Sequence, residues 1–259
     1  MKDKELVSII MPSYNCGDFL EESIRSVQAQ TYKNWELIFM DDCSSDDSIA
    51  KASSMRDKDN RIRVLRNTDN YGAAYTRNHA LKEAKGRWIA FLDSDDLWEP
   101  TKLEKQVRFM EENGYSFSYT GYQEIDSDSN PTGVFISGPA HITKAGMYAF
   151  CWPGCLTVMY DASKIGLLQI EDIKKNNDYA MWLKVIQKAD CYLLDECLAR
   201  YRRGRAGSVS SHSISTMIKW HYKLFREAEK MSVIPSLWHT GVNLVCGFYK
   251  KMKYVKKVN

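Results

Sequence analysis

Short apolar runs of strand length alternate with segments of helical spacing through the first third of the chain. The runs contain mostly apolar side chains, whereas the segments between them place apolar residues three or four positions apart. The expected strands cover residues 6–11, 35–40, 62–66 and 88–92, and the expected helices cover 18–30, 46–58 and 73–85. Because a helix of crossover length follows each of the first three strands, the strands should pair in parallel with right-handed connections. The pattern predicts an open, mostly parallel α/β sheet with helices on both faces.

The alternation is less regular after residue 92. The elements expected there are helices at 99–113 and 177–188 and strands at 115–122, 133–137 and 154–160. A polar, turn-rich stretch at 126–131 indicates a hairpin or a flap. We therefore divide the chain into a first half, residues 1–122, a second half of the same domain, residues 123–214, and a helical tail, residues 215–259.

The tail has the pattern of a basic amphipathic helix. From Leu237 onward a helical wheel places these apolar residues on one face: Leu237, Trp238, Leu244, Val245, Phe248, Met252 and Val255. Lys250, Lys253 and Lys257 lie elsewhere on the wheel. Such a helix can lie in the headgroup layer of a membrane, with its lysines near anionic lipid. It can equally pack on the domain and leave a solvated outer face.

Composition and charge limit the classes of partner. With 259 residues, 44% of them hydrophobic and 12% aromatic, the chain can bury one sizeable core. Residues 215–259 hold nine Lys and Arg against two Glu, which leaves 27 basic against 31 acidic residues in 1–214. The body is thus mildly acidic and has no repeated basic and aromatic platform. We expect no nucleic-acid partner.

The seven cysteines and the lengths of the apolar runs bear on localisation. The cysteines include no CxxC pair, which favours a reducing, cytoplasmic setting. No apolar run approaches the roughly 18 residues of a membrane span, and the run from Leu6 to Pro12 is too short for a signal-peptide core. We expect a cytoplasmic protein that does not cross the bilayer.

Polar side chains follow three of the expected strands. They occupy the stretches 12–15, 41–46 and 93–96. Any one of them could be a turn with a capping side chain. Parallel strands, however, direct their carboxyl ends to one edge of the sheet, where ligands of such folds bind. The three stretches together predict a ligand crevice at that edge.

The most informative of these stretches holds three carboxylates, Asp93, Asp95 and Asp96, directly after the apolar run 88–92. Crowded carboxylates repel one another and raise each other's pKa unless a cation or a donor-rich ligand neutralises them. Oxygen ligands suit Mg²⁺ or Mn²⁺, which commonly share their shell with substrate phosphates. The cluster therefore indicates a metal-bound diphosphate, although the same residues could simply begin the helix at 99–113.

An ordered series of motifs resembles family 2 glycosyltransferases, which build the surface polysaccharides of bacteria. The resemblance covers about residues 5–210, and its motifs are Val7–Asn15, Gln30–Tyr32, Asp41–Ser44, Asn70–Gly72, Arg77–Asn78, Asp93–Asp96 and Asn177–Asp178 with Trp182. It implies the GT-A fold, which is a Rossmann-like open sheet with helices on both faces and a smaller subregion on the acceptor side. It also implies a hexosyl- or N-acetylhexosaminyltransferase.

The resemblance assigns the donor side of the site. It implies that Pro12, Tyr14 and Asp42 line the nucleotide pocket, and that Arg77 reaches the base or the diphosphate. The DxD motif, Asp93-Ser94-Asp95, would bind the sugar nucleotide. The Mn²⁺ or Mg²⁺ cofactor is expected on Asp95 or Asp96, with the direct ligand left open among the three aspartates.

On the acceptor side, Asp178 matches the general base, while Trp182 and Asn177 match acceptor-region positions. Asp178 could instead merely complement the dipole of its helix. A single carboxylate base with direct attack inverts the anomeric centre, so we expect an α-linked UDP-sugar to give a β-linked product. The family usually has Gly where Cys43 stands, and commonly Glu where Asn177 stands.

The expected acceptor is a hydroxyl of a glycan, carried on a polyprenyl diphosphate lipid. Membrane contact through the tail would then place the enzyme on the inner face of the cell membrane. The segment Tyr201–Ser210 resembles a basic loop that closes over the nucleotide, with a plain surface loop as the alternative.

Two other functions stay open at this point. One is a non-catalytic sugar-nucleotide-binding protein. The other is a nucleotidyltransferase, which would normally carry a Gly-rich basic loop after its first strand. The stretch Pro12–Gly17 has one glycine and no cation, which disfavours that second alternative.

Overall fold

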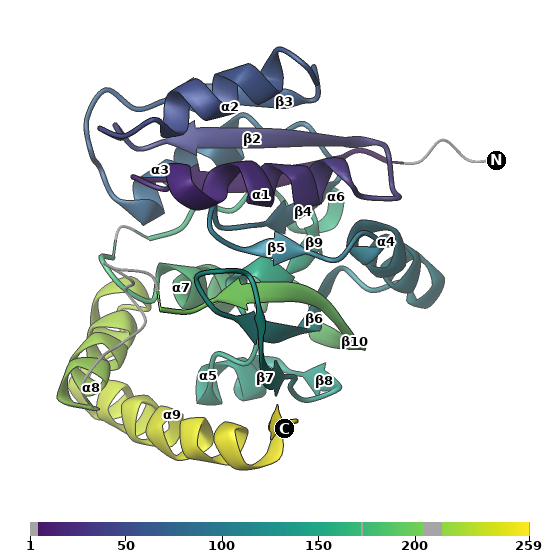
Figure 1. Ribbon diagram of the computed structural model, residues 1–259. Helices are drawn as coiled ribbons and strands as arrows, with labels where there is room; N and C mark the ends of the chain where they lie inside the picture. Colours follow the sequence, from purple (N-terminus) through teal and green to yellow (C-terminus); the bar gives the residue numbers. More distant parts are fainter. Residues whose placement is uncertain (1–4, 172, 205–213, 259) are drawn as a thin grey trace.

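The computed structural model describes residues 5–171, 173–204 and 214–258. A single mixed sheet runs through the protein, in the order β11-β7-β6-β9-β4-β1-β2-β3, with β10 paired beside β6 (Figure 1). Its first part is wholly parallel and consists of β1 (Val7–Ser13), β2 (Trp35–Asp41), β3 (Ile62–Arg66) and β4 (Trp88–Phe91). All four strands were predicted from the apolar runs.

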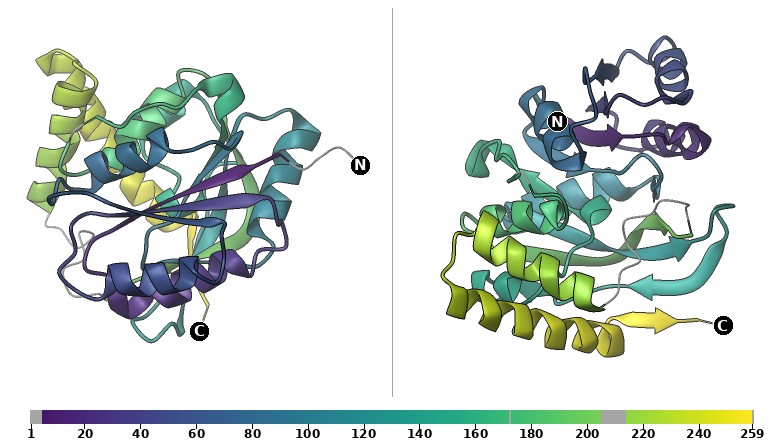
Figure 2. Two further views of the ribbon diagram at one scale, coloured as in Figure 1. Left: turned by 90° about the horizontal axis from the view of Figure 1, so that it is seen from above. Right: turned by 90° about the vertical axis from the view of Figure 1, so that its left-hand side faces the viewer.

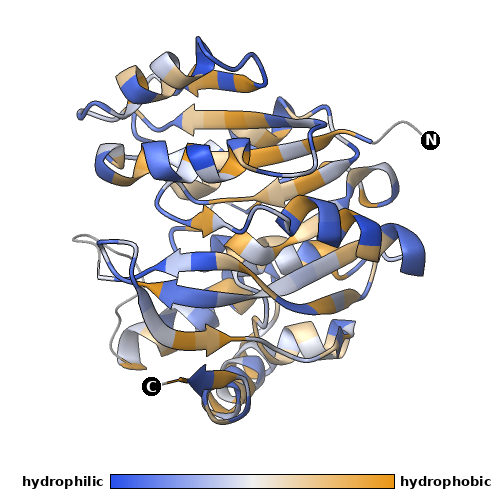
Figure 3. Cartoon of the chain, turned by 45° about the vertical axis from the view of Figure 1, so that its right-hand side comes forward, coloured by the Kyte–Doolittle hydropathy of each residue, from blue (hydrophilic) through white to orange (hydrophobic). Residues whose placement is uncertain are grey.

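Helices cover both faces of this parallel part. Helices α1 (Gly17–Gln28) and α2 (Ser48–Arg56) lie on one face, and α3 (Ala73–Lys82) lies on the other (Figure 2). Successive side chains of a strand point to opposite faces. Ile9 accordingly joins the core under α1, whereas Ile10 joins the core under α3. β1, β2 and β4 therefore carry mostly the apolar colour in Figure 3, because both of their faces are buried.

The second part of the sheet is mainly antiparallel, which differs from the mostly parallel sheet that the sequence predicted. Its principal strands are β6 (Phe117–Ile125), β7 (Pro131–Ile136), β9 (Met159–Asp161) and β10 (Cys191–Arg202). β6 and β7 form the expected hairpin around 126–130. β9 pairs antiparallel with β4 and β6, and only β10 runs parallel to β6. Hairpin connections force antiparallel neighbours, whereas helical crossovers allow parallel ones.

Two elements differ from the expectation. The strand expected near 154–160 is a 3₁₀ turn, η1 (Cys155–Thr157), followed by the three residues of β9. β10, which has 12 residues, was not predicted. Its register against β6 shifts between Leu194 and Cys197, so the alternation of polar and apolar side chains is interrupted in its middle.

The remaining elements frame the site and the base of the molecule. They are β5 (Leu97–Trp98), β8 (His141–Ile142), α4 (Lys102–Asn113), α5 (Lys144–Ala149), α6 (Ala162–Ile165), α7 (Asn177–Val185), α8 (Ile214–Lys223), η2 (Leu224–Ala228), α9 (Val233–Lys253) and β11 (Val255–Lys257). The predicted amphipathic tail helix corresponds to α9. Val255 lies outside that helix, in β11, where it pairs with Ile136 of β7. No helix in the described ranges has both the length and the apolar character needed to cross a membrane.

Candidate functional site

An open cleft of about 670 Å³ lies at the carboxyl ends of β1, β2 and β4, as the topology predicts. Most of the predicted site residues line it: Pro12, Tyr14, Asp42, Arg77, Asp93, Ser94, Asp95, Asn177 and Asp178. They come from the ends of three strands, from the second turn of α3 and from the first turn of α7. Predicted site residues as far apart in the chain as Pro12 and Asp178 thus share one cavity.

The loops after β1 and β2 are joined by hydrogen bonds. The Asn15 amide donates to Ser44 Oγ at 2.9 Å, and the Ser45 amide donates to Asn15 Oδ1 at 2.9 Å. Asn15 has φ +47°, a left-handed conformation that Asn tolerates better than most residues. The two loops therefore form one rigid wall at this end of the cleft.

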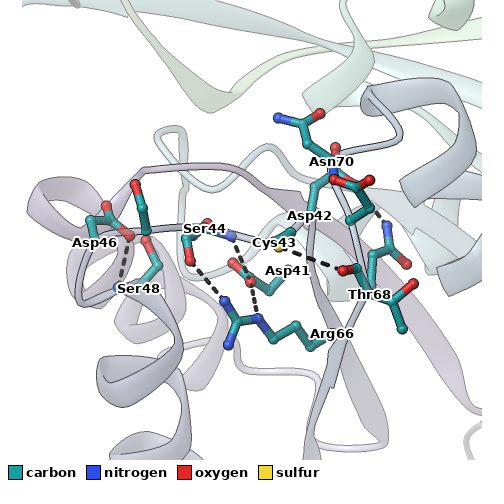
Figure 4. A network of polar contacts seen from close by, with 12 residues as sticks. Asp41, Asp42, Cys43, Ser44, Asp46, Ser48, Arg66, Thr68 and Asn70 are labelled. Carbon is teal, nitrogen blue, oxygen red and sulfur yellow. Dashed lines mark hydrogen bonds and ion pairs between the residues drawn. The ribbon is translucent and has the colours of Figure 1, made fainter.

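Asp41 anchors the second loop from below (Figure 4). Its Oδ2 accepts from the Ser44 amide at 3.0 Å and pairs with Arg66 Nε at 3.2 Å. The Arg66 guanidinium also donates to the Ser44 carbonyl at 2.8 Å. Asp41 is fully buried and lies under the loop, so its task is structural, and Asp42 is the residue that faces the cleft.

Asp42 organises the chain between β3 and α3. Its carboxylate accepts from Asn67 Nδ2 at 2.8 Å, from the Tyr71 amide at 3.0 Å and from the Gly72 amide at 2.7 Å. Gly72 has φ +85°, which residues with a side chain rarely adopt, and it directly precedes α3. A carboxylate has about four acceptor positions, so one remains for an N–H donor of a ligand.

Cys43 has φ +61°, again in the left-handed region. This conformation explains why the resembled family usually has glycine at this position. The backbone makes the turn with cysteine, at a conformational cost of roughly 1–2 kcal/mol. The loop is thus retained despite the departure from the family pattern.

Arg77 joins the two sides of the cleft. Its Nη1 donates to Asn177 Oδ1 at 2.6 Å, and its Nη2 pairs with Asp93. Burial acts to lower the pKa of Arg77, but the charges of Asp93 and Asp178 raise it overall, so the guanidinium stays positive. A fixed cation is therefore held between the DxD stretch and the first turn of α7.

The three clustered aspartates have different environments. Asp93 pairs with Arg77, and Asp95 lines the cleft. Asp96 is 1% exposed, does not line the cleft, and accepts from the Arg202 amide at 2.8 Å. Burial, together with Asp95 and Asp93, raises the pKa of Asp96 well above its ordinary value. The alternative that placed the metal on Asp96 is therefore not supported, because its carboxyl is directed into the protein.

Asp178 lies in the first turn of α7 and faces the cleft. Its Oδ1 accepts from the Tyr179 amide at 2.8 Å. Burial raises the pKa of the Asp178 carboxyl above its ordinary value, although Arg77 and the Tyr179 amide act in the opposite direction. A carboxylate with a raised pKa is a better proton acceptor at neutral pH than an ordinary one.

Trp182 lies in the core, which corrects its predicted place in the acceptor region. It is fully buried, and its ring packs edge-on against Phe91 at a centroid distance of 5.2 Å and lies 6.0 Å from Phe117. On α7 it follows Asp178 by four positions, so it lies one turn further along the same helix. Trp182 thus packs in the core and does not line the cleft.

Several cleft residues were not predicted as site residues. They are Lys174 and Lys175 before α7, Cys155, and Thr216, Met217, Trp220 and His221 on α8. The two lysines follow a stretch without helical or strand periodicity, so only their charge could have indicated them. Burial raises the pKa of the Cys155 thiol well above its ordinary value, which leaves it neutral and a poor nucleophile.

The basic loop expected over the nucleotide is only partly described, because residues 205–210 lie outside the described ranges. Tyr201 lines the cleft. The two described arginines bind elsewhere: Arg202 Nη2 pairs with Glu22 at 2.7 Å, and Arg203 Nε pairs with Glu124 at 2.8 Å. The charge of these two arginines is therefore used within the protein and does not face a diphosphate.

Comparisons with known proteins identify the family of the chain. The model of the family described as glycosyl transferase family 2 matches residues 8–151. The putative teichuronic acid biosynthesis glycosyltransferase TuaG of Bacillus subtilis is 40% identical over 236 residues, covering 91% of this chain and 93% of that protein. The Escherichia coli UDP-Glc:alpha-D-GlcNAc-diphosphoundecaprenol beta-1,3-glucosyltransferase WfaP is 42% identical over 215 residues, covering 83% and 84% of the two chains.

Solved structures show the same fold. The S. aureus TarS fragment 1-349 in complex with UDP-GlcNAc superposes with a TM-score of 0.70 at 20% identity, covering 96% of this chain and 76% of that one. The mannosyltransferase PcManGT from Pyrobaculum calidifontis, solved with GDP-Man and Mn2+, gives a TM-score of 0.64 at 12% identity and covers 96% and 76%. At these identities the structures support the fold alone.

Proposed function

The chain belongs to glycosyltransferase family 2 and is a glycosyltransferase of the GT-A fold, and we propose that it transfers a sugar from UDP to a hydroxyl of a lipid-linked glycan with inversion at the anomeric carbon. Family membership sets aside the nucleotidyltransferase alternative. The main support for this proposal is the position of Asp178, whose carboxyl has a raised pKa and faces the same cleft as Asp42 and Asp95.

Asp178 would act as the general base. A sugar hydroxyl is a poor nucleophile at neutral pH, and a positioned carboxylate that accepts its proton in the transition state contributes about 10² to 10⁴ in rate. The backbone amide of Tyr179 fixes one carboxylate oxygen, so the other is available to the acceptor hydroxyl. The proton passes to Asp178 as the hydroxyl oxygen bonds to the anomeric carbon and the bond to UDP breaks.

The charges in the cleft favour direct inversion over a covalent route. A covalent route needs a second carboxylate free to act as nucleophile. Asp93 is paired with Arg77, and Asp42 is held by three donors in the loop before α3. Asp178 is therefore the best base, and a single displacement from an α-linked donor gives a β-linked product.

The donor end of the cleft fits a uridine diphosphate sugar. Asp42 retains an acceptor position for a ring N–H of the base, and the Tyr14 ring is 47% exposed at the cleft wall, where it can pack against a base. The diphosphate would lie near Arg77 and the DxD residues Asp93, Ser94 and Asp95. The name of WfaP specifies UDP-Glc, which supports the same nucleotide here.

Mn²⁺ or Mg²⁺ fits the donor set of the cleft. Such ions keep several waters and bind through one or two carboxylates together with substrate phosphates, so a cage of protein ligands is not needed. The described residues contain no group of three or more His, Cys, Asp or Glu side chains suited to hold a metal. Asp95, assisted by Asp93, would hold the ion, which when bound supplies positive charge to the leaving diphosphate.

The proposed acceptor is a glycan on a polyprenyl diphosphate. The name of WfaP specifies a diphosphoundecaprenol acceptor, and Lys174 and Lys175 at the acceptor side of the cleft could pair with a second diphosphate. Such a lipid lies in the membrane, and its sugars face the cytoplasm when cytoplasmic UDP-sugars are used. We therefore propose that the enzyme works peripherally on the inner face of the cell membrane.

A donor screen with Asp178→Asn tests the proposal. Purified enzyme is given UDP-sugars, Mn²⁺ and a short-chain lipid-diphosphate sugar, and product is measured by mass spectrometry. We expect transfer by the wild type, a loss of about 10² or more in kcat for Asp178→Asn, and unchanged UDP binding by calorimetry. Asp57→Asn, at the exposed end of α2, is the matched control and should stay active. Full activity of Asp178→Asn would remove Asp178 from its role.

A further inference from the structure

Helix α9 packs on the protein with its polar side. The residues buried on α9 are Ser236, Thr240 and Asn243. Six large apolar residues on it are 57% to 81% exposed: Ile234, Leu237, Trp238, Val245, Phe248 and Met252. At about 100° per residue these six fall on one face, opposite to the buried one. We call them the outer face of α9.

Specific contacts fix the polar side inward. Asn243 Nδ2 donates to the Tyr179 hydroxyl at 3.0 Å. Lys250 Nζ donates to the Trp152 carbonyl at 2.7 Å. A Cβ on Gly247 would lie 3.1 Å from the ring of Phe150, so the helix approaches α5 closely at that point. Rolling the helix to bury its outer face would break both hydrogen bonds.

The far end of α9 is fixed as well. β11 follows the helix after one residue and pairs antiparallel with β7, with Val255 opposite Ile136 and Lys257 opposite Val134. Figure 1 shows α9 running across the base of the molecule into this strand. The contacts from Asn243 to β11 therefore hold the outer face away from the core along the second half of the helix. A large exposed apolar patch of this kind marks an interaction site.

The charged side chains of α9 and β11 themselves are all positive. Residues 230–259 contain six lysines and no aspartate or glutamate. Lys251 and Lys253 are exposed and follow Phe248 closely, so on the helical wheel they border the outer face on its two sides. An apolar stripe with lysines along its borders matches an anionic lipid surface, where the stripe enters the acyl boundary and the lysines meet phosphates.

Helix α8 links this surface to the cleft. Helices α8 and α9 pack against each other, and the right-hand view of Figure 2 shows them together at the lower edge of the molecule. Ile214, Met217 and Ile218 are exposed on α8 at helical spacing. Met217 also lines the cleft, together with Trp220 on the same helix. An apolar path thus leads from the base of the molecule to the acceptor side of the cleft.

We propose that the outer face of α9 rests in the headgroup layer of an anionic bilayer, and that α8 carries the lipid part of the acceptor from that layer to the cleft. The proposal rests on the proposed function, because only a lipid-linked acceptor requires such a path. With the outer face of α9 on the bilayer, the enzyme is oriented so that its cleft opens at the level of the membrane.

Vesicle sedimentation with the full chain tests this surface. The probes are vesicles of phosphatidylcholine alone and of phosphatidylcholine with an equal part of phosphatidylglycerol. The test variant is Trp238→Ser with Phe248→Ser, two exposed residues whose removal leaves no cavity. The matched control is Leu167→Ser, an exposed leucine after α6. We expect binding of the wild type and the control to anionic vesicles, and at least about tenfold weaker binding of the double variant.

The outcomes separate this inference from the proposed function. The double variant should lose transfer to a long-chain acceptor in vesicles and keep transfer to a short-chain acceptor in solution. Failure of the wild type to bind anionic vesicles, or equal binding by the double variant, would overturn the surface while leaving transfer in solution intact. If the wild type is a dimer in solution and the double variant is a monomer, the outer face is a contact between two copies of the chain, and the inference is overturned too. No transfer to any acceptor would instead contradict the proposed function.

Discussion

Arg77 and Asn177 lie 100 residues apart in the chain and meet in the cleft, where Arg77 Nη1 donates to Asn177 Oδ1 at 2.6 Å. The contact ties α3 to the first turn of α7 and so positions Asp178, the next residue. Because the Asn177 amide is neutral, it orients Arg77 without neutralising it. The positive charge of Arg77 is thus compensated by Asp93 and remains close to the expected diphosphate.

Removing this contact should slow transfer without abolishing it. In Asn177→Ala the Nη1 donor of Arg77 loses its partner, and an unsatisfied buried donor costs about 1–3 kcal/mol. We expect kcat to fall by roughly tenfold or more, which is less than for Asp178→Asn, as measured by steady-state kinetics. Asn177→Asp keeps an acceptor oxygen and should restore most of the rate. An Asn177→Ala enzyme with wild-type kcat would show that the contact is dispensable.

The pH dependence of kcat should report Asp178. Burial raises its pKa, and the base works only when ionised, so kcat should fall as the pH drops through a value above the ordinary range for aspartate. The same shift has a consequence for stability. The folded state holds the proton to a higher pH than the unfolded state does, so stability falls as the pH rises between the two pKa values.

Asp178→Asn removes that loss of stability, and we expect its melting temperature at neutral pH to exceed that of the wild type. The difference should shrink at a pH below the ordinary aspartate pKa, where the Asp178 carboxyl of the wild type is protonated in both the folded and the unfolded state. Differential scanning calorimetry across pH measures it. A variant that is less stable at every pH would mean that Asp178 is a structural residue.

The metal prediction separates two neighbouring aspartates. Asp95→Asn should lose most of the Mn²⁺ stimulation of transfer, because Asp95 faces the cleft. Asp96→Asn should keep it, because Asp96 accepts a hydrogen bond from the Arg202 amide inside the protein. Activity measured against Mn²⁺ concentration with UDP-sugar present tests both. If Asp96→Asn lost the Mn²⁺ stimulation and Asp95→Asn kept it, the ion would bind to Asp96.

Replacing Cys43 by glycine should relieve its left-handed backbone conformation. Cys43→Gly removes a left-handed cost of about 1–2 kcal/mol and adds an unfolded-state entropy cost of about 0.5–1 kcal/mol. We expect a net gain of about 0.5–1 kcal/mol in the free energy of unfolding, measured with urea. Cys16→Ala provides no such relief, because Cys16 is buried and has a negative φ. A loss of stability in Cys43→Gly would show that the thiol packs usefully.

The first part of the fold could be predicted because its strands are buried on both faces. Runs such as 6–11 and 35–40 have no polar interruption and are separated by helices, so periodicity alone indicated parallel pairing. β10 could not be predicted, because a bulge near residues 194–197 interrupts its alternation. The antiparallel second part depends on hairpins whose partners the sequence does not specify.

Most cleft residues were predicted because they follow strand ends or match ordered motifs. The burial of Trp182 and Asp96 could not be predicted, because a sequence indicates the helix or loop on which a residue lies but not the direction of its side chain. Trp182 packs against Phe91 in the core, and Asp96 is directed toward Arg202. The same holds for the tail. The helical wheel predicts the apolar face of α9, but it does not indicate whether that face packs against the core or faces solvent.

The anomeric configuration of the product tests the account most directly. With the α-linked UDP-sugar that the enzyme accepts, proton NMR of the newly formed linkage gives that configuration from its coupling constant. A single base, Asp178, and direct displacement predict a β-linkage. An α-linkage would require a second displacement or a different attack geometry, and would contradict the assignment of Asp178 as the general base.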